Sequence, residues 1–394
     1  MADSGAERRL WFGTWGASSQ PITQGFVDVP TIEGQTIRQV VRLSVGGDSL
    51  RLKLANAHSS APIIIGAARV AIAGPDAAIL PDTDRPVCFS DATSLTLRQS
   101  ESMVSDPIDL KVPDRALLAI SLFLPGKPSF GAWHATGLQT AYISASGDHT
   151  GDETFDVAGT FQQRLLISGV DVSSESAKGT IVCFGDSVTD GSASTPDSDR
   201  RWPDQLARRL AERDGSLKYG VVNAGIAGNR LLRDVIGMRG LKRFERDVLP
   251  VPGVKYVTLL HGNNDLGFPY MPDDSPLAAT ADRSPVKAAD IIAGQQSVVA
   301  MAREAGLKVY GATLPPFIGA PFFDAAKADG ERLKVNEWIR DGGAFDAVID
   351  FDAALRDPAN PSVLLPAYDS GDHLHPSDTG YEKMAETIDL ALFP

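Results

Sequence analysis

Cysteine is scarce in this chain of 394 residues, which has only Cys88 and Cys183. Two cysteines cannot build a disulfide framework or a cysteine-rich zinc site. No stretch approaches the roughly 20 consecutive apolar residues that a helix needs to cross a bilayer. The N-terminus, MADSGAERRLWFGTW, also lacks the apolar core of a signal peptide. We therefore expect a soluble, cytoplasmic protein, or a secreted or periplasmic one if a leader has been removed.

Positive charge is also in short supply. Lys and Arg number 37 against 50 Asp and Glu, so the formal net charge is −13. An acidic chain without long basic runs is poorly suited to bind a polyanion, so nucleic acid and anionic membrane surfaces are not expected as partners. Hydrophobic residues make up 43% of the chain, which is enough for packed cores, and the length predicts two or three domains.

The N-terminal half, residues 1–172, has the pattern of a β domain. Short runs rich in Val, Ile and Leu occupy residues 36–45, 49–57, 61–74, 106–112, 116–126 and 138–145, with turn sequences such as AGPDAA and SGDHTGD between them. No amphipathic helix interrupts these runs. Many short strands at this spacing predict a β-sandwich or jelly roll.

The pattern changes at a polar, Ser-rich connector over residues 171–179. Beyond it, strands predicted at 181–185, 219–225, 255–262, 307–314 and 347–355 alternate with helices at 202–213, 241–249, 284–306, 331–343 and 377–393. Five β-α units predict a parallel sheet with helices on both faces, in a second domain of residues 173–394. Ligands of such sheets bind at the carboxyl ends of the strands.

A serine follows the first strand of the predicted parallel sheet, in the sequence Gly-Asp-Ser at residues 185–187. If a helical turn begins there, its free N–H groups and positive dipole end favour a developing anion. Gly-Asp-Ser is also ordinary turn chemistry, and the same string occurs at residues 47–49. That copy lies between two strand-like runs of the β half, so we expect a hairpin turn there and a structural role for Ser49.

Glycine and asparagine follow the next two strands. The second strand ends in NAGIAGN, residues 223–229, where glycines let backbone N–H groups approach a ligand. The third ends in HGNND, residues 261–265, in which the neutral amide of Asn264 can donate a hydrogen bond to an oxyanion. A tight βα turn and a loop cap are the structural alternatives for these two segments.

Asp372 and His375 follow the fifth strand, in the sequence DHLHP. A general base for serine needs an imidazole with one nitrogen free and the other held by a carboxylate. Asp372 and His375 are three residues apart and can meet within one turn of chain, whereas His373 is expected to pack or hydrogen-bond locally. A surface turn or helix cap is the alternative. Because all four motifs fall in strand order at one sheet edge and supply every role in acyl transfer, we interpret them as one active site.

These four blocks resemble those of the SGNH/GDSL hydrolases, a superfamily of esterases and lipases. The resemblance covers residues from about 179 to the C-terminus and implies a flavodoxin-like α/β/α fold with five parallel strands and ester hydrolysis. The N-terminal half is similar to a bacterial two-domain subset that opens with Trp-x-Gly-Thr-Trp, here residues 11–15, and carries a β domain before the hydrolase. Members of that subset are usually exported. His261 is not typical of the third block.

The resemblance implies a role for each matching residue. Ser187 would be the nucleophile, His375 the general base and then the general acid, and Asp372 the residue that orients the imidazole. The oxyanion hole would comprise the backbone N–H groups of Ser187 and Gly228 and the side-chain amide of Asn264. Attack, proton transfer and charge stabilisation then all have named groups, so we expect no cofactor and no metal.

The leading hypothesis is a serine esterase that forms an acyl-enzyme with short acyl groups, above all acetyl, from small-molecule or carbohydrate esters. Residues 268–285 favour it, because four prolines and the acids Asp273, Asp274 and Asp282 predict a stiff, polar border to the acyl site. A lipase, lysophospholipase or thioesterase for longer acyl chains is the alternative, and it would need an apolar channel. The β domain would serve as a scaffold or face carbohydrate, with Trp133 as a candidate contact or as a core residue.

Two further hypotheses differ in class. One is a carbohydrate-binding protein with an inactive hydrolase fold, since fold alone does not give activity. The other is a metal-dependent hydrolase, which would need Asp265, Asp372 and His375 as ligands and would leave Ser187 without a role.

Overall fold

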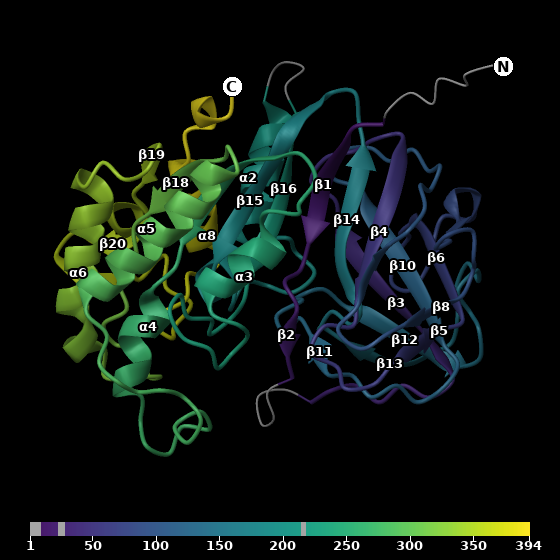
Figure 1. Cartoon of the computed structure of the whole chain (residues 1–394), viewed down its shortest axis with the longest axis horizontal. Helices are drawn as coiled ribbons and strands as arrows, with labels where there is room; N and C mark the ends of the chain where they lie inside the picture. Colours follow the sequence, from purple (N-terminus) through teal and green to yellow (C-terminus); the bar gives the residue numbers. More distant parts are fainter. Residues whose placement is uncertain (1–8, 23–27, 214–217) are drawn as a thin grey trace.

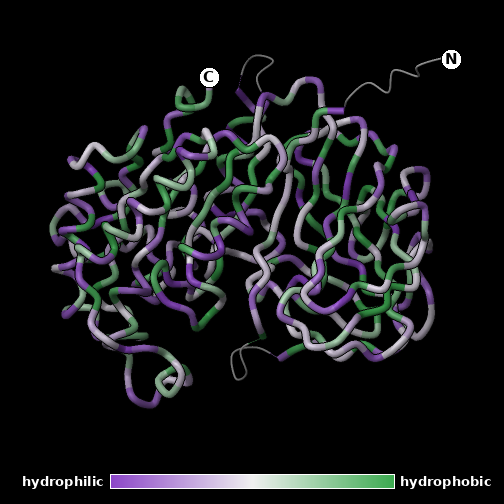
Figure 2. Tube along the Cα trace, viewed as in Figure 1, coloured by the Kyte–Doolittle hydropathy of each residue, from purple (hydrophilic) through white to green (hydrophobic). Residues whose placement is uncertain are grey.

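The computed structural model describes residues 9–22, 28–213 and 218–394. Figure 1 shows an N-terminal part made of strands beside a C-terminal part in which helices flank a sheet, with β1 (Trp11–Gly16) running between the two. Figure 2 shows hydrophobic segments concentrated in the interior strands of both parts. Within the described ranges, no helix is both long and apolar enough to cross a membrane. The leader prediction falls partly on residues 1–8, which lie outside the described residues.

Two larger antiparallel sheets form most of the N-terminal part, beside the two-stranded pairs β2 (Gln20–Pro21) with β11 (Ala132–Trp133) and β5 (Ile63–Ile65) with β8 (Leu95–Leu97). One has the order β1, β14 (Ile167–Ser173), β4 (Ser49–Ala55) and β9 (Ser102–Val104). The other has the order β13 (Val157–Phe161), β12 (Ala141–Ser146), β3 (Gln35–Arg42), β10 (Leu117–Leu124), β6 (Ala67–Ile72) and β7 (Arg85–Pro86). Alternate residues of both sheets share one core, among them Leu50, Leu52 and Leu54 of β4 and Leu118, Ile120 and Leu122 of β10. The predicted sandwich of antiparallel sheets is therefore confirmed.

Three predictions about the N-terminal part are wrong in detail. Residues 106–112 form only isolated bridges, because Pro107 lacks the N–H that a strand interior needs. The Gly-Asp-Ser copy at residues 47–49 is not a hairpin turn, since β3 and β4 lie in different sheets and β4 already begins at Ser49. The predicted connector over 171–179 is mostly strand: β14 ends at Ser173, and only three residues separate it from β15 (Ala177–Gly185). The division into domains after residue 172 stays a prediction.

A five-stranded parallel sheet forms the C-terminal part, in the order β16 (Lys218–Gly225), β15, β17 (Val254–Leu260), β18 (Lys308–Ala312) and β19 (Ala347–Ile349). Numbered from its first strand, this order is 2-1-3-4-5, which is that of a flavodoxin-like fold. Helices α2 (Trp202–Glu212) and α8 (Asp378–Thr387) pack together, and α5 (Ala288–Glu304) packs against α3 (Gly240–Asp247) and α6 (Ala325–Asp341). The predicted α/β/α class is confirmed.

The predicted element bounds needed three main changes here, of which one is that the last helix, expected over 377–393, ends at Thr387. Helix α6 begins six residues before its predicted start and tolerates Gly330 in its interior, at a cost of about 1 kcal/mol relative to alanine. The fifth strand is short and stops at Ile349. The Asp350 side chain then accepts a hydrogen bond from the Ala353 N–H and begins α7 (Phe351–Leu355), so residues 351–355 are helix rather than strand.

Candidate active site

Ser187 begins α1 (Ser187–Asp190), a single turn that follows β15 directly. The Asp186 carboxyl caps this turn by accepting a hydrogen bond from the Val188 N–H at 3.1 Å. Burial raises the pKa of Asp186 to about 7, against the Val188 N–H and the charge of His375, which both lower it. Gly191 ends the turn in the left-handed conformation, with φ of +94°. The serine is thus presented at the carboxyl end of β15.

His375 lies between Ser187 and Asp372. Its Nε2 is 2.9 Å from Ser187 Oγ, and its Nδ1 is 2.6 Å from Asp372 Oδ2. Asp372 Oδ1 accepts from the backbone N–H groups of Leu374 and His375 at 2.9 and 2.8 Å. Burial raises the pKa of Asp372, but the hydrogen bond and charge of His375 and the two N–H groups outweigh it and hold this pKa well below its usual range. An ionised Asp372 fixes the proton on Nδ1 and leaves Nε2 to accept from Ser187.

Three donors converge beside the serine. Within the described residues, the backbone N–H groups of Ser187 and Gly228 donate to no protein acceptor. Asn264 Nδ2 donates to the Asn229 carbonyl at 2.9 Å, which leaves its second N–H for a ligand. Gly228 adopts φ of +74°, and a Cβ at this position would collide with Ile236. Ser187, Gly228, Asn264 and His375 all line the same cavity.

A buried polar network holds the loop that carries Gly228. Asn229 Oδ1 accepts from Arg243 Nε at 2.8 Å and from His261 Nε2 at 3.1 Å. Burial and the nearby charge of Arg243 lower the pKa of His261 well below its usual value, so its imidazole is a neutral donor. Arg243 also donates to the carbonyls of Ala224 and Gly185 at 2.7 and 2.6 Å. Arg243 could not be recognised from the sequence, because a lone arginine in a helix belongs to no motif.

Asp265 anchors the neighbouring stretch of chain. Its two oxygens accept from the backbone N–H groups of Leu231 and Leu232 at 2.6 and 2.9 Å. Burial raises the pKa of Asp265 to about 6, against the lowering effect of these N–H groups. Asp265 and Asp372 therefore have protein partners of their own. No cluster of three or more His, Cys, Asp or Glu suited to a metal occurs in the described part of the chain.

The two remaining sequence candidates lie away from this chemistry. His373 is more than half exposed, and its Nδ1 is 2.5 Å from Asp369 Oδ2. Ser49 is buried at the start of β4, where its Oγ donates to the Ile108 carbonyl at 2.9 Å and accepts from Arg9. Neither residue lines the catalytic cavity.

The catalytic cavity has a volume of about 550 Å³ and is walled by both parts of the chain. Its apolar lining comprises Trp133, Ala135, Ala227, Ile236, Phe268, Met271, Pro272, Pro276, Leu277, Pro321, Phe322, Phe323 and Leu374. The predicted polar border is wrong in part: residues 268–285 do border the cavity, but Met271 and Leu277 are buried in an apolar cluster there. Of the three predicted acids only Asp274 lines the cavity, whereas Asp273 pairs with Arg283 and Asp282 pairs with Arg233.

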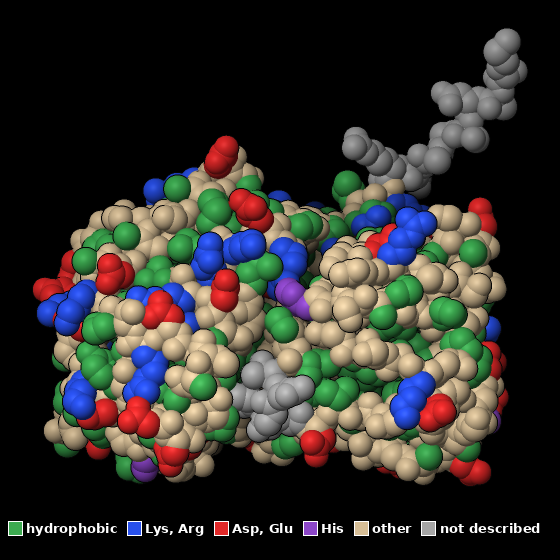
Figure 3. Space-filling view, turned by 60° about the horizontal axis from the view of Figure 1, so that its bottom comes forward, with side chains coloured by type: hydrophobic (Ala, Val, Ile, Leu, Met, Phe, Trp, Pro, Cys, Tyr) green, Lys and Arg blue, Asp and Glu red, His purple; other side chains and the backbone are tan. Residues whose placement is uncertain are grey.

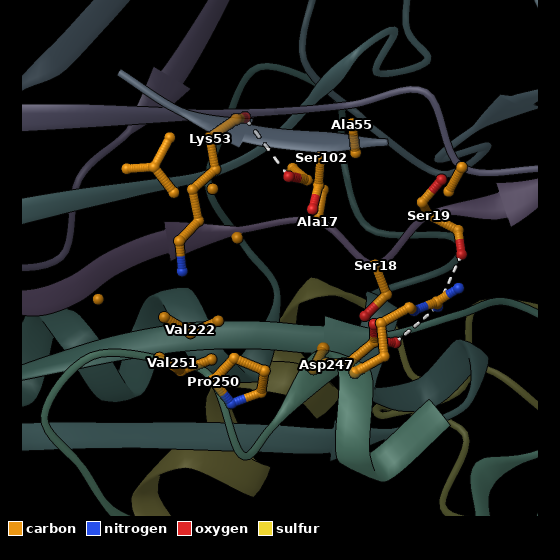
Figure 4. Close-up of a pocket in the computed structure, with 18 of the residues that line it drawn as sticks. Ala17, Ser18, Ser19, Lys53, Ala55, Ser102, Val222, Asp247, Pro250 and Val251 are labelled. Atoms are coloured by element: carbon orange, nitrogen blue, oxygen red, sulfur yellow. Dashed lines mark hydrogen bonds and ion pairs between the residues drawn. The ribbon is translucent and has the colours of Figure 1, made fainter. Parts of the chain in front are cut away.

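A second cavity, of about 480 Å³, lies between the two parts, and none of its lining residues belongs to the Ser-His-Asp set. Figure 4 shows the Lys53 side chain extending from the β part toward Val222, with Pro250 and Val251 beside it. On the face drawn in Figure 3, acidic and basic side chains are both scattered over the two parts.

A sequence profile of the GDSL-like lipase/acylhydrolase family matches residues 183–383, just over half of the chain. No curated protein matches the chain in sequence. A carbohydrate acetylesterase family member from Sinorhizobium meliloti aligns with 16% identity and a TM-score of 0.40, over 54% of this chain and 97% of its own.

Two further solved structures align over a similar region. The aryl esterase of M. smegmatis gives 16% identity and a TM-score of 0.39, over 53% of this chain and 95% of its own. A GDSL-like lipase from Bacteroides thetaiotaomicron VPI-5482 gives 17% identity and a TM-score of 0.37, over 55% of this chain and 88% of its own. The profile match, which spans the serine and histidine segments, carries the assignment: the chain belongs to the GDSL-like lipase/acylhydrolase family of the SGNH/GDSL superfamily and is a serine ester hydrolase.

Proposed function

We propose that Ser187 is the nucleophile of this hydrolase, with His375 as base and Asp372 as the group that orients the imidazole. The 2.9 Å contact between Ser187 Oγ and His375 Nε2 is the observation that carries the proposal. His375 takes the Ser187 proton as Oγ bonds to the ester carbonyl carbon, and returns it to the leaving alcohol as the C–O bond breaks. Water then attacks the acyl-enzyme, again through His375, and releases the acid and free Ser187.

The tetrahedral intermediate carries a negative oxygen that needs donors fixed in advance. The backbone N–H groups of Ser187 and Gly228 and the free N–H of Asn264 supply them. Arg243 and His261 support this role indirectly, because they hold Asn229, whose carbonyl orients the Asn264 amide.

Two preferences for the acyl group compete. The sequence predicts short acyl esters, such as acetyl esters of carbohydrates. The cavity lining supports the alternative, because Phe268, Met271 and Leu277 present apolar surface beside Gly228 and offer few partners to sugar hydroxyls. We infer that esters with an apolar acyl group longer than acetyl are the better substrates.

A chain-length series tests this inference. Acetyl, butyryl, octanoyl and palmitoyl esters of one aryl alcohol are compared by kcat/KM, beside acetylated oligosaccharides. We expect the maximum at butyryl or octanoyl, and Leu277→Ser should lower kcat/KM for these two more than for acetyl, because each buried methylene contributes about 0.8 kcal/mol. Leu80→Ser is the control, since Leu80 is an exposed leucine of the β part. A maximum at acetyl, or on the oligosaccharides, would restore the short-acyl hypothesis.

The β part serves as one wall of the catalytic cavity rather than as a separate carbohydrate-binding module. Trp133 is only 2% exposed and packs in the β core, so it offers no open platform for a sugar ring. Gln20, Ala135 and Thr136 from the same part also line the catalytic cavity. The hypothesis of an inactive fold finds no support in the geometry, because a binding protein would not need the Ser-His-Asp contacts.

A further inference from the structure

His134 of the β part contacts the turn that carries the catalytic serine. Its Nε2 is 3.0 Å from Asp190 Oδ1, and its Nδ1 is 3.0 Å from the carbonyl oxygen of Ser18. Both side chains are buried, with 4% of His134 and none of Asp190 exposed. His134 follows β11 (Ala132–Trp133) directly, so a strand of the β part sets its position.

The His134 ring faces two acceptors, the Ser18 carbonyl at Nδ1 and the Asp190 carboxylate at Nε2. The contact with Asp190 Oδ1 is within ion-pair distance but outside hydrogen-bond geometry. Among the described residues, His134 is the only ion-pair partner of Asp190. Loss of this contact would leave the buried carboxylate with the Ala227 N–H and the more distant charge of Arg243, which is a less favourable arrangement inside a protein.

Asp190 connects the two backbone donors of the oxyanion hole. It is the last residue of α1, whose first residue is Ser187. Its Oδ2 accepts from the Ala227 N–H at 2.8 Å, and Ala227 immediately precedes Gly228. One carboxylate thus connects the serine turn to the glycine loop, and His134 lies within ion-pair distance of its other oxygen.

We propose that His134 is a positioning residue for catalysis: through Asp190 it sets the separation of the Ser187 and Gly228 N–H groups that bind the oxyanion. This inference rests on the proposed function. The β part then contributes directly to turnover. His134 lies outside residues 183–383, the segment that matches the family, and yet affects the stabilisation of the transition state.

Two near-isosteric substitutions separate this role from simple packing. In His134→Gln the amide nitrogen takes roughly the place of Nε2 and keeps a donor for Asp190. In His134→Asn it takes roughly the place of Nδ1 and keeps a donor only for Ser18. We expect His134→Asn to lower kcat on an aryl ester by about 10- to 100-fold, with little change in KM, because small misplacements of catalytic groups cost this much. His134→Gln should retain most of the wild-type kcat.

A double-variant cycle completes the test. Asp190→Asn keeps the side-chain volume and should lower kcat as His134→Asn does, and the double variant should be no worse than either single variant, because the pair acts as one unit. His149→Asn is the control, since His149 pairs with Asp152 within the β part. Equal kcat for the Gln and Asn variants, a loss confined to KM, or additive losses in the cycle would overturn the inference. Ser187→Ala is measured beside these variants and tests the proposed function separately. If Ser187→Ala kept the wild-type kcat, the proposed function would be refuted rather than the role of His134.

Discussion

Replacing Asn264 by alanine should damage catalysis and stability by separate, predictable amounts. Asn264 Nδ2 has two N–H groups, of which one donates to the Asn229 carbonyl and the other faces the cavity. Loss of an oxyanion donor lowers kcat by about 10²- to 10³-fold, or roughly 2.7–4 kcal/mol of transition-state stabilisation, with a smaller effect on KM. Asn229 is fully buried, so its carbonyl is left without this partner and unfolding should become easier by about 1–3 kcal/mol.

Steady-state kinetics on an aryl ester and urea unfolding measure the two effects on one preparation. Asn263→Ala is the matched control, because Asn263 is the adjacent buried asparagine of α4 (Asn263–Gly267) and does not line the cavity. It should keep kcat close to the wild-type value. If Asn264→Ala changed KM alone, Asn264 would bind substrate rather than the transition state, and the assignment of the oxyanion hole would be refuted.

Three further predictions concern the Ser-His-Asp set. Ser187→Ala should lower ester turnover by about 10⁴- to 10⁶-fold without unfolding the chain, whereas Ser49→Ala should leave kcat nearly unchanged. The reverse result in steady-state assays would show that Ser187 is not the nucleophile. His375→Ala should lower kcat far more than His373→Ala, and equal losses would argue against His375 as base. The depressed pKa of Asp372 contributes stability that is present above the unfolded value of about 4 and is lost as pH falls through the folded value. The difference in urea stability between wild type and Asp372→Asn should therefore shrink from pH 7 to pH 3, and a constant difference would contradict this.

The parts of the site that the sequence predicts are those with strand-end motifs. Buried strands such as β15 and β17 are recognisable in the sequence as apolar runs. The residues that follow such strands must meet at one edge of a parallel sheet. The contact between Asp372 and His375 could be predicted from their spacing of three residues alone. These inferences depend on local pattern and topology, which a single sequence contains.

Other features depend on contacts between distant segments. Arg243, Asn229 and His261 come from three separate segments of the chain. The sequence around each of these residues does not indicate which distant residue it contacts. The polar composition of residues 268–285 predicted a polar border, but the structure buries Met271 and Leu277 beside the cavity and brings only one of the three acids, Asp274, to its wall. Composition does not say which side chains of an irregular segment face a cavity. The link from His134 to Asp190 spans the two parts and was likewise invisible.

Covalent labelling tests the central claim most directly. A fluorophosphonate reacts with a serine that an adjacent base activates, and peptide mass mapping then locates the label. We expect a single label on Ser187 in the wild-type protein, and a strongly reduced labelling rate in His375→Ala, because the 2.9 Å contact that activates Oγ is lost. A label on another serine, or an undiminished rate in His375→Ala, would contradict the proposed nucleophile and base.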